Sequence, residues 1–98
     1  MPGLTIVYWR DIPAQVMVGK GRAAARRELP GRFAEAIDRA AMKSGAQETD
    51  AYLADWRRDG PVETEGDPEA IVAAAAERLD ADYPPERLKS LIENGGRA

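Results

Sequence analysis

The sequence predicts a small α+β domain in which a three-stranded sheet carries helices on one face. Three observations lead to this prediction. A run of β-branched and aromatic residues near the N-terminus suits a strand, and two later segments repeat apolar residues with helical spacing. The chain of 98 residues has room for one compact domain over residues 1–98. The expected element order is β-β-α-β-α-α.

The first two strands are expected to form a hairpin. Residues 4–10 (LTIVYWR) are largely apolar on both alternating faces, which is typical of a central strand. Pro13 interrupts this run because proline has no N–H to donate to a neighbouring strand. Residues 15–20 (QVMVGK) supply the second strand. We expect a turn longer than two residues around Pro13, with the side-chain amide of Gln15 tying that turn to the backbone.

A short helical turn and three helices are expected from composition, capping signals and apolar spacing. Residues 22–29 are basic and rich in alanine and predict a short helical turn. An amphipathic helix begins at Pro30 and ends at Gly45, a residue type favoured at the left-handed C-terminal position. Asp67 followed by proline is a strong helix start. That helix stops at Pro84, and a last short helix follows it.

The segment 49–58 (TDAYLADWRR) is compatible with a strand or a helix. As a strand, Tyr52 and Trp56 share one face, and as a helix they lie on one stripe with Leu53. Two alternating aromatic residues favour the strand, and the glycine, proline and acidic residues of 60–66 indicate a loop. A strand–helix–strand crossover makes the second and third strands parallel. The doubly apolar first strand then lies between them, in the order 2-1-3 of a split β-α-β unit.

Composition removes most familiar active sites. The chain has no cysteine and no histidine, so disulfides, thiolate metal sites, a cysteine nucleophile and the commonest general base are excluded. Serine and threonine have no nearby base in the sequence. We therefore expect a non-enzymatic protein with no catalytic residue, no metal site and no cofactor.

Charge is divided unevenly along the chain. Residues 1–45 carry a net charge of +4 and residues 46–98 a net charge of −7. The positive charge is concentrated in residues 20–32, so this basic segment is a candidate site for an anion or a nucleic acid. A solvated face is the preferred interpretation, because the whole chain is negative and lacks an RNA-binding aromatic motif, so nucleic acid is disfavoured. The candidate binding residues of this segment are Lys20, Arg22, Arg26 and Arg27.

Trp56 and Arg57 complete the candidate binding residues. Trp56 is expected beside Trp9 on a neighbouring strand, where the two rings form the main apolar block of the core. Tryptophan is also enriched at the energetic centres of protein interfaces, so a surface role for Trp56 is the alternative. Arg57 lies next to it and offers a polar partner.

The ends of the chain predict a cytoplasmic protein. The N-terminus has neither the basic nor the apolar region of a signal peptide. The longest wholly apolar run, residues 70–76, is far too short to span a bilayer. The tail from about residue 94 is expected to fray.

Several stretches together resemble the bacterial virulence factor domain. They are residues 5–16 (TIVYWRDIPAQV), 26–42 (RRELPGRFAEAIDRAAM), 50–58 (DAYLADWRR) and 76–92 (AERLDADYPPERLKSLI). The most diagnostic elements are Ile12-Pro13-x-Gln15, Leu29-Pro30-x-x-Phe33, Trp56 and Tyr83-Pro84. The same domain looks to form the middle region of longer proteins called conserved virulence factor C, and this chain resembles a stand-alone member.

The resemblance implies a function in outline only. It brings no reaction and no catalytic residue, and it implies an interaction or accessory module that binds a protein partner. A second implication is an accessory subunit of a one-carbon or corrinoid methyl-transfer system. The third hypothesis, an anion or nucleic-acid binder, depends on the basic segment and not on the resemblance.

Overall fold

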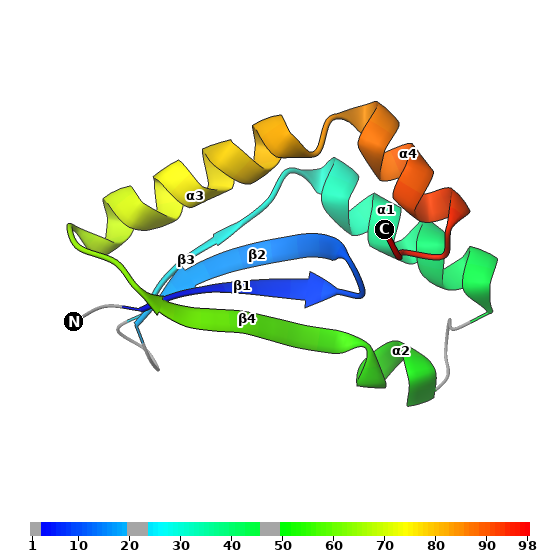
Figure 1. Ribbon diagram of the computed structural model, residues 1–98, viewed down its shortest axis with the longest axis horizontal. Coiled ribbons are helices and arrows are strands. Elements are labelled where there is room, and N and C mark those ends of the chain that lie inside the picture. Colours follow the sequence, from blue (N-terminus) through cyan, green and yellow to red (C-terminus); the bar gives the residue numbers. More distant parts are fainter. Residues whose placement is uncertain (1–2, 20–23, 46–49) are drawn as a thin grey trace.

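The computed structural model describes residues 3–19, 24–45 and 50–98 of the chain (Figure 1). Within these ranges, four strands form one sheet in the order β3-β2-β1-β4, and each neighbouring pair is antiparallel. Helix α3 packs on β2 and β3, α1 packs on β2, and α4 packs on α1, so β4 lies farthest from these three helices. The elements in chain order are β1 (Gly3–Trp9), β2 (Ile12–Val18), β3 (Ala25–Glu28), α1 (Gly31–Ser44), α2 (Asp50–Ala54), β4 (Trp56–Glu63), α3 (Pro68–Asp82) and α4 (Pro85–Glu93).

The α+β class is as expected, but the three-stranded sheet is wrong. The additional strand is β3, in the segment where a short helical turn was expected. Its four residues pair with β2, and the N–H of Leu29 extends this pairing by donating to the Ala14 carbonyl (3.1 Å). Alanine and arginine are among the best helix formers, but tertiary context routinely overrides helix propensity, and here the edge of β2 offers backbone hydrogen bonds that favour a strand.

The last strand also differs from the expectation. Residues 50–54 form the short helix α2, and β4 then runs through residues 60–63, which were expected in a loop. β4 pairs antiparallel with β1, so β2 and β4 run in the same direction on either side of β1. Gly60 makes this pairing possible at a register shift: its φ is +122°, and a Cβ there would lie 2.5 Å from the Leu4 carbonyl oxygen. Pro61 follows and has no N–H for a further strand.

The β1–β2 hairpin is tighter than expected. Trp9 pairs with Ile12, so the turn consists of Arg10 and Asp11 alone. Arg10 has φ 54°, in the left-handed region that non-glycine residues seldom occupy. Pro13 is buried within β2, and Gln15 lies in the middle of β2 opposite Val7, so neither residue belongs to the turn. The expected role of Gln15 in closing the turn is therefore wrong.

Helix starts and stops follow the signals in the sequence. α1 ends with Gly45 in the left-handed conformation, and its N–H donates to the Ala41 and Met42 carbonyls. The Asp67 side chain accepts from the Ala70 N–H (3.1 Å) and caps α3, with a proline in the first turn. These helices bury their apolar stripes in one continuous core, whose largest fully buried side chains are Trp9, Phe33, Ile12, Val16, Val18 and Val72.

The C-terminal residues are docked on the hairpin turn instead of fraying. The Asp11 N–H donates to the Gly96 carbonyl (2.8 Å), and the Ala98 N–H donates to the Asp11 carboxylate (2.6 Å). Arg10 Nη1 also donates to the Gly95 carbonyl (2.6 Å). Gly96 is buried with φ +93°, and a Cβ there would lie 2.8 Å from Trp9 Cζ3. The tail therefore covers the Trp9 ring.

In the described ranges, no helix is long and apolar enough to cross a lipid bilayer.

Candidate functional site

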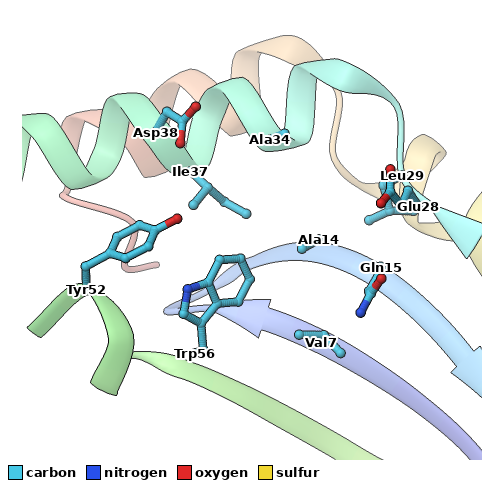
Figure 2. A pocket seen from close by; sticks show the side chains of 10 residues that line it. All are labelled: Val7, Ala14, Gln15, Glu28, Leu29, Ala34, Ile37, Asp38, Tyr52 and Trp56. Atoms are coloured by element: carbon cyan, nitrogen blue, oxygen red, sulfur yellow. The ribbon is translucent and has the colours of Figure 1, made fainter. Parts of the chain in front are cut away.

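A groove of about 330 Å³ lies between α1 and the end of the sheet (Figure 2). Its floor is part of a row of side chains that crosses all four strands. Glu28 pairs with Gln15, Gln15 with Val7, and Val7 with Arg58. Residues that pair directly across strands project on the same face of a sheet. Gln15 and Val7 line the groove, with Glu28 at one edge, and Arg58 lies at the other end of the row.

This row lies on the face opposite the one covered by α3. Leu4, Ile6, Val16 and Val18 pack into the hydrophobic core, whereas their neighbours in sequence alternate to the other side. α1 reaches over the end of this second face and supplies Ala34, Ile37 and Asp38 to the groove wall. The groove therefore lies between α1 and the sheet face that this helix covers only in part.

Two aromatic side chains close one end of the groove. Tyr52 of α2 and Trp56 of β4 meet edge to face, with ring centroids 6.0 Å apart and planes at 88°. The fully buried Trp9 fixes this arrangement from below, because its Nε1–H donates to the Tyr52 carbonyl (2.9 Å). Figure 2 shows both rings beneath α1, with Trp56 directed toward Ile37. Both side chains are half-buried, so each presents ring surface to the groove.

The charged residues that line the groove are both acidic. Glu28 and Asp38 are exposed, and neither is in an ion pair with another described residue. Arg58 and Arg26 lie on the same sheet face but outside the lining. The groove thus combines an apolar and aromatic interior with carboxylates at its rim, which is typical of sites that bind a small group with defined polarity.

Of the residues that the sequence predicted for binding, Trp56 lines the groove and Arg57 does not. Arg57 projects to the opposite face, where its guanidinium lies over the Tyr8 ring (4.4 Å to the centroid). Its Nε donates to the Arg10 carbonyl (2.9 Å), so it supports the hairpin turn. Trp56 pairs with Trp9 across β1 and β4 and packs against the core, but it is only partly buried. The expected core block of the two rings is therefore complete for Trp9 and partial for Trp56.

The tyrosine beneath Arg57 has a raised pKa. Burial raises the pKa of Tyr8 above its usual value, and the nearby Tyr83 and Asp59 act in the same direction. Arg57 and Arg87 lower that pKa and offset part of the increase. The phenol is therefore held protonated, which is the opposite of what a nucleophile or general base requires.

The basic segment is not assembled into one patch by its described members. Arg26 and Arg27 are successive residues of β3, so their side chains project to opposite faces of the sheet. Arg32 bonds to the Asp80 and Tyr83 carbonyls (2.8 and 3.1 Å) and joins α1 to the end of α3. Lys20 and Arg22 lie outside the described residues.

Sequence reasoning missed most of the groove. It placed Gln15 in a turn, and it did not single out Glu28 and Asp38. The helical alternative for residues 49–58 would have found one feature, since it puts Tyr52 one turn before Trp56. Across the ranges that the structure covers, no cluster of three or more acidic side chains could hold a metal ion.

Comparison with known families identifies the chain. The family described as "Virulence factor" matches residues 7–92. The chain belongs to the virulence factor family. The residues matched to the virulence factor family include every residue that lines the groove. Searches of curated proteins and of solved structures gave no match.

Proposed function

We propose that this virulence factor domain is a non-enzymatic interaction module whose groove holds a segment of a partner protein. The observation that carries this proposal is the contrast between the two tryptophans. Trp9 is fully buried and fills the core, whereas its cross-strand neighbour Trp56 leaves ring surface in a groove. Half-buried tryptophan and tyrosine in a pocket are typical of residues that dominate protein-binding energies.

The composition and size of the site support binding over catalysis. The chain has no histidine or cysteine to act as base or nucleophile. A volume of about 330 Å³ is at the lower end of ligand pockets, where it accommodates one or two side chains better than a large cofactor. The nucleic-acid hypothesis loses support because Arg26 and Arg27 project to opposite faces.

The experiment is affinity capture from the native host, comparing wild-type protein with Trp56→Ala. Leu53→Ala is the matched control, because Leu53 is 70% exposed on α2 but does not line the groove. Captured proteins are identified by mass spectrometry, and the complex is rebuilt from purified components. We expect the wild type and Leu53→Ala to retain the same partner and Trp56→Ala to lose it while keeping its fold by circular dichroism. A partner that binds Trp56→Ala undiminished contradicts the proposal.

A further inference from the structure

We infer that the groove selects a lysine or arginine side chain of the partner, whose cation packs against the aromatic pair near Asp38 in a groove that Glu28 borders at its other end. This inference rests on the proposed function and names the chemistry of the segment that binds. It follows from two observations. Arginines of this chain cover most of its aromatic rings, and carboxylates border the groove that holds the two uncovered rings.

Four of the six aromatic side chains carry an arginine of this chain. Guanidinium groups lie over Trp9, Phe33, Tyr8 and Tyr83, at 4.5, 4.8, 4.4 and 4.1 Å from the ring centroids. These distances are typical of a cation attracted to the negative face of an aromatic ring. The remaining two are Tyr52 and Trp56, and no cation of the described residues lies over either ring. Both of these rings line the groove.

The charges at the rim complement a cation. Asp38 of α1 borders the groove above Tyr52, and Glu28 of β3 borders it at the opposite end, away from the aromatic pair. A cationic group near Trp56 would meet a ring face with the Asp38 carboxylate on the same side of the groove, and its alkyl stem would cover Val7 and Ile37. Glu28 adds a second negative charge at the far end of the groove. An anionic group would face both carboxylates instead. Arg58 lies at the end of the same row and repels a cation. The positive charge of the bound segment is therefore expected on the α1 side of the groove.

The test measures binding of capped tripeptides that differ only in the central residue: lysine, arginine, norleucine or glutamate. Binding is followed by NMR through the indole N–H of Trp56 and the side-chain amide of Gln15. We expect the lysine and arginine peptides to shift both signals, and the norleucine peptide to bind at least about tenfold more weakly. Raising the salt concentration from about 0.05 to about 0.5 M should weaken the cationic peptides several-fold, because the carboxylates are exposed.

A charge variant tests the carboxylates directly. Glu28→Gln combined with Asp38→Asn should reduce affinity for the lysine and arginine peptides by about tenfold. Glu77→Gln, an exposed acidic position on α3 away from the groove, should leave it unchanged. The inference is overturned if the norleucine or glutamate peptide binds as tightly as lysine, or if the double variant binds normally. It is also overturned if no peptide shifts either signal up to about 10 mM, a concentration that reveals even a millimolar dissociation constant.

The two proposals fail in different ways. If a host partner depends on Trp56 but no cationic peptide binds, the charge selection is wrong and the interaction module stands. If the captured partner is indifferent to Trp56→Ala, the module is wrong at this groove, whatever the peptides show. If both depend on Trp56 and the partner's binding falls with the double charge variant, both proposals are supported.

Discussion

Trp9 and Trp56 face each other across β1 and β4 and both contact Tyr52, yet they are buried to different extents. Trp9 is closed on all sides: Arg10 lies over its ring, its N–H bonds to the Tyr52 carbonyl, and Gly96 of the tail packs against it. Trp56 touches Tyr52 and then opens onto the groove. Two paired tryptophans therefore have different roles: Trp9 fills the core and Trp56 lines the groove. The difference arises because the C-terminal tail and Arg10 cover Trp9 and not Trp56.

The largest expected effect separates the two tryptophans by stability. Trp9→Ala should lower the free energy of unfolding by about 3–5 kcal/mol, the usual cost of truncating a fully buried aromatic residue. Trp56→Ala should cost less, about 1–2 kcal/mol, because Trp56 is only partly buried at the edge of the core. Urea denaturation of both variants measures the difference. Equal losses would contradict the division between core and groove.

The next effect tests how the tail closes the Trp9 side. Gly96→Ala should lower the free energy of unfolding by about 3 kcal/mol, because it adds a Cβ against the Trp9 ring and strains a left-handed backbone. Gly45→Ala is the control: Gly45 has φ +74°, but its Cβ would meet no atom within 4 Å. Gly45→Ala should lower the free energy of unfolding by about 1 kcal/mol, because it adds only the strain of a left-handed backbone. Similar losses in the two variants would show that the tail does not pack on Trp9.

A smaller effect is expected at the ion pair beneath the hairpin turn. Arg10 Nε donates to Asp55 Oδ2 (2.8 Å), and both side chains are largely buried, at 11% and 26% exposure. Asp55→Asn should cost about 1.5 kcal/mol, as for other hydrogen bonds between charged groups. Glu35→Gln, which removes an exposed pair with Arg39 on α1, should change stability by less than about 0.5 kcal/mol. Thermal melts at matched salt concentration compare the two variants.

The smallest effect is the contribution of Tyr8 to the pH dependence of the free energy of unfolding. Tyr8 lies on the face of the sheet away from the groove. Burial raises the pKa of Tyr8, so the folded protein holds this proton more tightly than the unfolded chain. As the pH rises above about 10, the unfolded chain loses the proton first, and the free energy of unfolding falls. Tyr8→Phe should show a shallower decrease between about pH 10 and pH 11 and no difference from wild type near neutral pH. The free energy of unfolding is measured by urea melts at each pH. The same slope against pH in wild type and Tyr8→Phe would contradict a raised pKa of Tyr8.

Local signals in the sequence predicted local structure well. The Asp67 cap, the Gly45 stop and the central position of the doubly apolar β1 all depend on a few neighbouring residues. The failures depend on distant ones. β3 is a strand because β2 offers it an edge, and the hairpin turn is tight because Asp55 and the tail hold Arg10. Neither partner can be identified from the residues beside it in the chain.

The groove was only partly predictable for the same reason. Trp56 stood out because tryptophan is scarce and often binds partners, but its site also needs Gln15, Glu28 and Asp38. These residues come from β2, β3 and α1 and meet only once the strand register is known. Arg57 shows the reverse error, since its position next to Trp56 in sequence puts it on the other face of β4.

The interruption of β4 has a consequence for how copies of the protein behave together. An exposed edge strand invites another chain to extend the sheet, which is a common start of aggregation. Here Gly60 distorts the strand, and Pro61 lacks the N–H that a new neighbour needs. The same strand carries four charged residues: Arg57, Arg58, Asp59 and Glu63. Concentrated solutions of the protein should therefore resist sheet-to-sheet polymerisation from this edge.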